Sequence, residues 1–311
     1  MTISIVTATY NRSKLLPVLY ASLLAQNYCE VEWIVVDDGG SDDTPQVIEE
    51  LRQAAPFPVR YVRQDNAGKQ RAVNHGLDLV VGDLVCIVDD DDYFLPNVFS
   101  VVVKDYESIV SNSAIAGLSY LTMNPEGKVW GREFPYDRML SDHYQCRINQ
   151  KIWGDKIEFT KASILQEHSI RYQITGSTGG FGGDTVFFLA VANIGKTLYL
   201  NQVILVKEYR ADGISVNWRR KSLENPALTA IYYAVYLDKR VNLFIRLRYM
   251  IAFAAIHAFA PDMVDDSPVH QSGNQLLYWI AWLPGKWISA KWKKYRDAEF
   301  PLSKRWMRLN E

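Results

Sequence analysis

The sequence predicts an α/β fold, in which helices flank a mostly parallel sheet and a helical C-terminal appendage follows. Strand and helix signals alternate over about the first hundred residues, which is typical of a parallel sheet with helices on both faces. The pattern from residue 222 onward is helical. The composition, 48% hydrophobic and 22% charged over 311 residues, is that of an ordinary globular protein.

Each element of the first part has its own signal. Short apolar runs rich in β-branched residues predict buried strands, and the longer segments between them predict helices. Pro45 suits the first turn of its helix, with Thr44 as the expected cap. The expected strands are Ile3–Ala8, Glu32–Val36, Val59–Val62 and Leu84–Val88, and the expected helices are Lys14–Gln26, Pro45–Gln53, Lys69–Leu79 and one after Pro96.

The remaining sequence predicts two further parts. Residues 114–221 combine short strand signals with loops, including the glycine-rich stretch Gly176–Gly183. The segments Pro226–Leu237 and Val241–Phe259 are predicted helices. We therefore expect a main domain over residues 1–221, with halves 1–113 and 114–221, and a helical region over residues 222–311.

Net charge and cysteine content indicate which partners and which cellular compartment to expect. The net charge of −1 gives no reason to expect nucleic acid as a partner. Cys29, Cys86 and Cys146 lack metal-ligand spacing, which suits free thiols in a reducing compartment. No signal-peptide pattern precedes the first strand. We expect a cytoplasmic protein, either free or peripheral on the cytosolic face of the inner or plasma membrane.

Four consecutive aspartates, Asp89 to Asp92, follow the apolar run Leu84–Val88. Carboxylates crowded at the end of a buried strand repel one another unless a positive group lies among them. The simplest such group is Mg²⁺ or Mn²⁺, which is held by one or two carboxylates and usually carries substrate phosphates. A solvated acidic turn is the alternative. An EF-hand is excluded, because Phe94 and Ser100 stand where Gly and Glu are needed.

Other polar residues also stand at strand ends and helix starts. Ligands of such sheets bind beyond the carboxyl ends of the strands. Asp38 ends the second strand and could accept N–H bonds from a base, in a pocket lined by Thr7, Thr9 and Tyr10. Lys69 and Arg71 begin a helix, where unpaired N–H groups suit a phosphate-rich ligand. Each residue taken alone is more often structural, and neither a Walker loop nor a dinucleotide fingerprint is present.

These motifs resemble, in order and spacing, those of family 2 glycosyltransferases of the GT-A fold. Between Ile3 and about Asn97 the ordered set is Thr-x-Tyr-Asn-Arg, Val-Asp-Asp-Gly-x-Ser, Asn-x-Gly-Lys-x-x-Ala-x-Asn-x-Gly and Val-Asp-Asp-Asp-Asp. Asp184 stands in a segment similar to the family's Glu-Asp motif, with Gly183 in place of the glutamate. Tyr209–Ser215 resembles a segment of bacterial polysaccharide transferases.

The resemblance implies a role for each matching position. Asp91 would ligate the metal that bridges the diphosphate, and Asp184 would be the general base. A helix N-cap before Thr185 is the structural alternative for Asp184, and it is compatible with the catalytic role. The residues that would hold the nucleotide-sugar are Thr7, Thr9, Tyr10, Arg12, Asp38, Lys69, Arg71, Asp89 and Asp90.

The predicted function is that of an inverting, metal-dependent glycosyltransferase of the hexosyltransferase type. It would move a sugar from a nucleotide-diphosphate sugar, with UDP preferred, to a glycan or polyprenyl-linked acceptor in bacterial surface-polysaccharide synthesis. Processive relatives usually carry a Gln-x-x-Arg-Trp motif, which is missing, so we expect one sugar per encounter.

Two alternatives remain open. One is a sugar-nucleotide nucleotidyltransferase, although Thr7–Arg12 lacks the glycine-rich loop that such enzymes normally have. The other is a non-catalytic nucleotide- or carbohydrate-binding protein on the same fold, which the departure at Gly183 leaves possible.

The end of the sequence combines aromatic and basic residues. Between Lys286 and Arg308 there are eight Lys/Arg and two acidic residues. Indoles and cations together are typical of an interfacial anchor on anionic lipid, so we expect residues 276–308 to contact a membrane peripherally. A helical appendage packed on the catalytic domain is the alternative. The tryptophans of this region are Trp279, Trp282, Trp287, Trp292 and Trp306.

Overall fold

The computed structural model describes residues 1–173, 183–208 and 222–296, which fall into two compact units. The first unit holds residues 1–173 and 187–208, and the second holds residues 183–186 and 222–296. Most of the glycine-rich stretch, the segment Tyr209–Ser215 and Trp306 lie outside the described residues.

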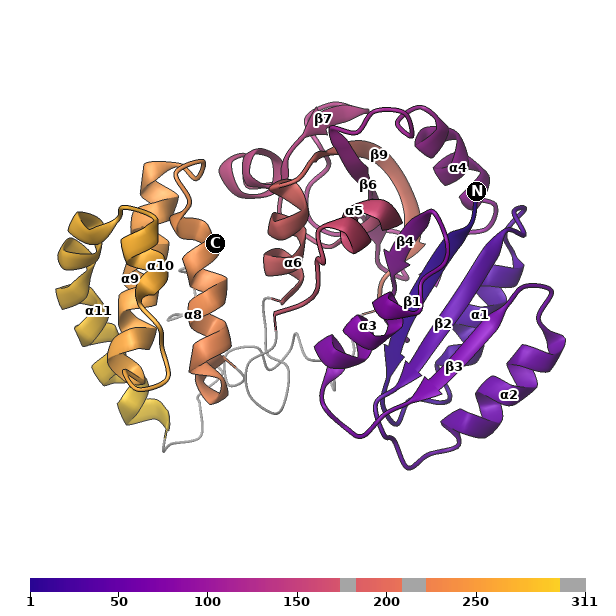
Figure 1. The fold of residues 1–311 in the computed structure, drawn as a ribbon, viewed down its shortest axis with the longest axis horizontal. Coiled ribbons are helices and arrows are strands. Elements are labelled where there is room, and N and C mark those ends of the chain that lie inside the picture. The colour runs from indigo at the N-terminus through magenta and orange to yellow at the C-terminus, as the bar shows by residue number, and fades with distance from the viewer. Residues whose placement is uncertain (174–182, 209–221, 297–311) are drawn as a thin grey trace. The chain divides into compact units, whose positions relative to one another are not determined.

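The first unit is built on one mixed sheet (Figure 1). Its strands are β1 (Ile3–Thr9), β2 (Val31–Asp37), β3 (Val59–Arg63), β4 (Leu84–Ile87), β5 (Tyr93–Phe94), β6 (Ile115–Met123), β7 (Met139–Ser141), β8 (Lys156–Lys161) and β9 (Lys196–Val206). Their order is β3-β2-β1-β4-β8-β6-β9-β5, with β7 also paired to β9. Strands β1 to β4, β6 and β9 run in one direction, and β5, β7 and β8 run against them. The prediction of a mostly parallel α/β sheet is confirmed.

Helices cover both faces of this sheet. They are α1 (Leu16–Leu24), α2 (Thr44–Ala54), α3 (Lys69–Asp78), α4 (Phe99–Glu107), α5 (Ala162–Glu167) and α6 (Gly183–Ala192), with a π-helix at Tyr144–Asn149. The four strands and the four helices predicted for about the first hundred residues all occur, within a few residues of their predicted bounds. The predicted Thr44 cap is wrong, because α2 begins at Thr44 and Asp42 Oδ1 accepts its backbone N–H and its hydroxyl at 3.2 and 2.7 Å.

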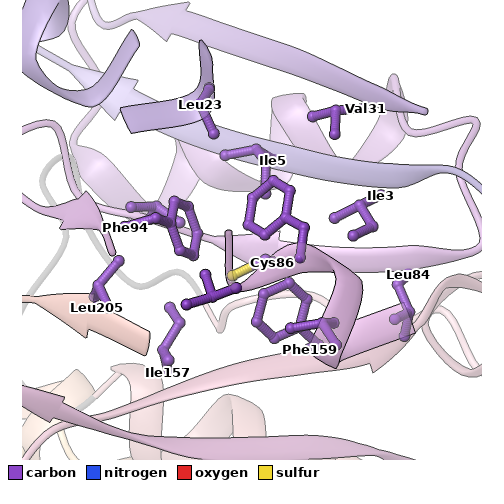
Figure 2. Close-up of a cluster of buried hydrophobic side chains, with 14 of the residues drawn as sticks. Ile3, Ile5, Leu23, Val31, Leu84, Cys86, Phe94, Ile157, Phe159 and Leu205 are labelled. Atoms are coloured by element: carbon purple, nitrogen blue, oxygen red, sulfur yellow. The ribbon is translucent and has the colours of Figure 1, made fainter. Parts of the chain in front are cut away.

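Two hydrophobic clusters hold these layers together. Ile5 of β1 and Trp33 of β2 belong to a cluster with residues of α1, α2 and α4, and part of that cluster is drawn in Figure 2. The adjacent residues Val6 and Ile34 belong to the other cluster, with residues of α3, α5 and α6. Successive side chains of a strand point to opposite faces, so a sheet covered on both faces needs continuous apolar strands. The charged residues of the predicted site accordingly lie at or beyond strand ends, while Ser4 and Glu32, which are polar and buried within β1 and β2, hydrogen-bond to each other.

The described part of the second unit is helical, as predicted for the C-terminal appendage. It comprises α8 (Pro226–Ala234), a 3₁₀ turn (Val235–Leu237), α9 (Leu243–Phe259), α10 (Ser267–Gln271) and α11 (Gln275–Arg296). Residues of α8, α9 and α11 share one hydrophobic cluster. A Cβ at Gly285 would lie 2.7 Å from the Ala254 Cβ, so the glycine allows α11 to approach α9 closely.

None of the helices in the described residues is both long enough and apolar enough to cross a membrane.

Candidate functional site

The polar residues that follow β1 and β4 meet because these two strands are parallel neighbours. Ile3 to Val6 pair in register with Leu84 to Ile87, so both strands end at the same edge of the sheet. Thr9 Oγ1 donates a hydrogen bond of 2.8 Å to Asp90 Oδ2. Arg12 Nη1 lies 3.0 Å from both Asp90 Oδ1 and Asp91 Oδ2. Four of the predicted site residues, Thr9, Arg12, Asp90 and Asp91, are thus in direct contact.

The four aspartates form a turn that contacts two lysines from distant segments. The turn is closed by the Asp92 N–H, which donates to the Asp89 carbonyl at 3.2 Å. Lys69, the first residue of α3, pairs with Asp89 Oδ1. Lys207, directly after β9, lies 2.9 Å from Asp92 Oδ2 and 3.2 Å from Asp89 Oδ2. Together with Arg12, these lysines supply three cations to four carboxylates.

Lys207 was not among the residues singled out from the sequence. Its position follows from the pairing of β5 with β9, in which Tyr93 faces Val206, so that the residue after Val206 lies beside the residue before Tyr93. The signal available in the sequence was the same as for the aspartates, namely a polar residue at the carboxyl end of a strand. It was missed because the sequence did not define a strand over 196–206.

Burial and these cations act in opposite directions on the aspartates. Burial raises the pKa of Asp90 to about 6, although Thr9 and Arg12 hydrogen-bond to its ionised form. Burial likewise raises the pKa of Asp92 to about 7, with Lys207 opposing the shift. For Asp89, burial alone would raise the pKa, but Lys207 and Lys69 together outweigh it and hold the pKa well below its usual range. Burial and the charge of Asp89 raise the pKa of Asp91, so additional positive charge near Asp91 would stabilise its ionised form.

Three of the carboxylates form a donor set that fits a divalent cation. Asp89, Asp91 and Asp92 each offer an oxygen, and these oxygens lie within 4.8 Å of one another. Carboxylate oxygens are the ligands that Mg²⁺ and Mn²⁺ prefer. Asp92, to which the family resemblance assigned no role, joins this set. Lys207 already contacts two of its members and is therefore an internal competitor for any metal.

Asp38 anchors the loop that leads into α3. Its Oδ1 accepts hydrogen bonds from Gln64 Nε2 at 2.8 Å and the Ala67 N–H at 2.9 Å, and its Oδ2 accepts one from the Gly68 N–H at 2.8 Å. Gly39 has a φ of +77°, and a Cβ there would lie 2.8 Å from the Asn66 nitrogen. Only glycine allows this close approach. Asp38 therefore helps to set the direction in which α3 presents Lys69.

The other predicted nucleotide-sugar residues differ in exposure. Thr7 is fully buried and accepts a hydrogen bond of 3.1 Å from the Trp33 indole, so it supports the end of β1 from within the core. Tyr10 follows β1 and is 48% exposed. Arg71 is half-buried in the first turn of α3.

Asp184 belongs to the second unit, and it is exposed in the first turn of α6. A carboxylate in this turn is favoured by the partial positive charge of a helix N-terminus. Since α6 begins at Gly183, Asp184 lies inside the helix rather than at its cap.

Comparison of the sequence with known proteins agrees with the family that its motifs resemble. Residues 4–171 match the model of the family described as Glycosyl transferase family 2. A relative from Campylobacter jejuni, named GalNAc(5)-diNAcBac-PP-undecaprenol beta-1,3-glucosyltransferase, is 31% identical over 181 residues, which are 56% of each chain. The chain spans between 32% and 56% of the length of this and two other curated relatives that it matches.

Solved structures share the fold at low sequence identity. Staphylococcus aureus TarS, solved in complex with UDP, has a TM-score of 0.59 and 17% identity, over 98% of this chain and 95% of that one. The mannosyltransferase PcManGT from Pyrobaculum calidifontis, solved with GDP-Man and Mn²⁺, has a TM-score of 0.57 and 16% identity, over 96% of this chain and 88% of that one. These likenesses support the GT-A fold that the sequence motifs predicted.

Proposed function

The chain belongs to glycosyltransferase family 2, and on that basis we propose that it is an inverting, metal-dependent transferase that adds one sugar per encounter. The donor would be a nucleotide-diphosphate sugar, preferably a UDP-sugar. The acceptor would be a hydroxyl of a glycan or of a polyprenyl-linked sugar in bacterial surface-polysaccharide synthesis. The relative from C. jejuni and the UDP complex of TarS support this choice by their names alone.

The acidic turn is the observation that carries the proposal. Asp89, Asp91 and Asp92 would hold Mn²⁺ or Mg²⁺, with Asp91 as the principal ligand. A divalent cation bound there would supply Lewis-acid stabilisation for a diphosphate leaving group. Arg12 lies 3.0 Å from Asp91 and Lys69 pairs with Asp89, so both cations are placed to attract the phosphates of the donor. An arrangement of four carboxylates and three cations is more than a solvated acidic turn requires.

The remaining roles follow the family motifs. Asp38, Thr9 and Tyr10 would contact or support the base and ribose of the donor, and Arg71 would lie near its phosphates. Asp184 would accept the proton of the acceptor hydroxyl, a contribution usually worth about 10²–10⁴ in rate. Attack on the face opposite the diphosphate would invert the anomeric centre. Residues 1–221 would form the catalytic domain, with donor binding in 1–113 and acceptor binding in 114–221.

The test is release of nucleotide from a panel of UDP-, GDP- and dTDP-sugars with Mn²⁺, with and without candidate acceptors. Donors would first be ranked by the thermal shift that they produce with and without Mn²⁺. We expect one UDP-sugar to stabilise the protein in a metal-dependent way and to be consumed when its acceptor is present. The anomeric configuration of the product, read by NMR, tests inversion.

The same assay separates the two alternatives. A nucleotidyltransferase would form a nucleotide-sugar from a nucleoside triphosphate and a sugar phosphate, with release of pyrophosphate. A binding protein would show the thermal shift but no consumption of any donor with any acceptor. Either result would contradict the proposal.

We also propose that the protein works at the cytosolic face of a membrane, where a polyprenyl-linked acceptor would be presented. Residues 276–308 would make the peripheral contact. The support is the combination of indoles and basic residues in this region, for which anionic lipid is a suitable partner.

A further inference from the structure

Helix α11 exposes a continuous apolar stripe. Leu276, Trp279, Ile280, Leu283 and Trp287 are between 57% and 76% exposed, and we call this set the α11 face. Their spacing of one, three or four residues places them on the same side of an α-helix. Single exposed apolar residues are common on protein surfaces, but a row of five large ones marks an interaction site.

The α11 face is not the side by which this helix joins its own unit. Ala281 is fully buried in the cluster that α11 shares with α9, and Trp282 packs against the same cluster. Gly285 also lies on this inner side, since a Cβ there would lie 2.9 Å from the Ala254 carbonyl carbon of α9. The helix is therefore apolar on two sides, and only the inner one is used for folding. The outer one needs a partner outside the unit.

The charge of α11 indicates what that partner is. The helix has no acidic residue, and its basic residues are Lys286, Lys291, Lys293, Lys294 and Arg296. On the α11 face, Lys291 Nζ lies 3.2 Å from the ring centroid of Trp287, and on the inner side Lys286 Nζ lies 5.2 Å from that of Trp282. Indoles beside ammonium groups suit the level of lipid headgroups, where one end of the side chain is apolar and the other is hydrated.

A second copy of the chain fits the same face less well. Pairing two α11 faces would bring together two helices that carry lysines and no carboxylate to pair with them. Lysines buried without a partner carry a large desolvation cost. A bilayer accepts the apolar row in its acyl region and leaves the lysines in the headgroup layer, so the charge is never buried.

We propose that the α11 face lies on the surface of a bilayer that contains anionic phospholipids. Trp279 and Trp287 rest at headgroup level, Leu276, Ile280 and Leu283 enter the acyl boundary, and the lysines bind lipid phosphates. This deepens the peripheral contact proposed above and does not depend on the catalytic assignment.

The test is vesicle flotation of the full-length protein. One set of vesicles is phosphatidylcholine alone, and the other is phosphatidylcholine mixed with phosphatidylglycerol. We expect the protein to float with the mixed vesicles and to remain mostly at the bottom with the neutral ones. The double substitution Trp279→Ser/Leu283→Ser should lower the partition coefficient by about tenfold or more. Lys286→Gln should lower it about fivefold on the mixed vesicles.

The matched control is Trp153→Ser, which removes an indole of similar exposure, 60%, from the first unit. It should float as the wild type does. Failure of the wild type to float with anionic vesicles, or equal flotation of the double variant, would overturn the proposal. A dimer seen by light scattering without lipid, and lost in the double variant, would assign the face to a second copy instead.

Failure of this proposal is distinguishable from failure of the catalytic one. Flotation does not depend on turnover, so Asp91→Asn should float normally. Nucleotide release is measured without vesicles, so it is unaffected by the α11 face.

Discussion

The acidic turn after β4 concentrates carboxylates, and the α11 face concentrates large apolar side chains. Cations from the same unit offset the charge of the acidic turn, whereas the α11 face is left exposed. Arg12, Lys69 and Lys207 reach the aspartates from segments 78, 20 and 118 residues away. The apolar row on α11 remains mostly exposed. A charged site that is already compensated has a fixed geometry and suits a small charged ligand. An exposed apolar row suits an extended partner, because its free energy is lowered only when water is removed from the whole row.

The largest expected effect is that of Asp91→Asn. Loss of this carboxylate should lower nucleotide release by at least about 100-fold, because the leaving diphosphate loses stabilisation in the transition state. It should also remove the Mn²⁺-dependent part of the donor's thermal shift. Asp43→Asn, at an exposed aspartate, is the control and should change neither. Full activity of Asp91→Asn would show that the acidic turn is only structural.

Asp184→Asn should separate chemistry from binding. We expect turnover to fall by about 10²–10⁴, as for the loss of a general base, while the Mn²⁺-dependent thermal shift with the donor stays at the wild-type value. The two measurements are made on the same preparation. A loss of donor binding equal to the loss of turnover would remove Asp184 from the role of base and place it in the donor site.

Lys207→Met tests whether Lys207 neutralises the carboxylates of the acidic turn. Without this cation the carboxylates repel more strongly, so the metal-free variant should melt at a lower temperature. Mn²⁺ should then bind at least about tenfold more tightly in the absence of nucleotide, because its competitor is gone. Titration of Mn²⁺ followed by electron paramagnetic resonance measures this directly. Lys207→Arg is the matched control and should bind Mn²⁺ with the affinity of the wild type.

Asp38→Asn should have a smaller effect. An amide group would face N–H donors from Gln64, Ala67 and Gly68, and at least one hydrogen bond would be lost. We expect the free energy of unfolding in urea to fall by about 1–3 kcal/mol. Asp65→Asn, at an exposed position in the same loop, serves as control. Unchanged stability would mean that the loop before α3 does not depend on Asp38.

The smallest effect belongs to the α11 face. In solution, Trp279→Ser/Leu283→Ser should change the free energy of unfolding by no more than about 0.5 kcal/mol for each substitution, because both side chains are exposed. Nucleotide release with a water-soluble acceptor should also be unchanged. A large loss of stability would show that other parts of the protein cover the α11 face. The α11 face would then, like the acidic turn, have its partners within the protein.

Much of the first half of the fold could be predicted because its signals are local. The apolar runs at Ile3–Ala8 and Leu84–Val88 are buried on both faces, so they are recognisable without knowledge of their neighbours. The predicted site residues Thr9, Arg12, Asp90 and Asp91 come together because parallel strands end at the same edge. Thr7 shows the limit of such reasoning. It also stands near a strand end, but its hydroxyl accepts a hydrogen bond from Trp33 in the core.

The sequence by itself determined the family, the parallel sheet and the presence of an acidic turn, because these depend on short motifs and on the order of strands and helices. Only the tertiary structure decided how the turn is neutralised, since the pairing of β5 with β9 brings Lys207 to aspartates more than a hundred residues earlier. It also decided which side of α11 is free. The sequence of α11 is apolar on two sides and does not reveal which of them faces the core, and the close approach to α9 at Gly285 settles it.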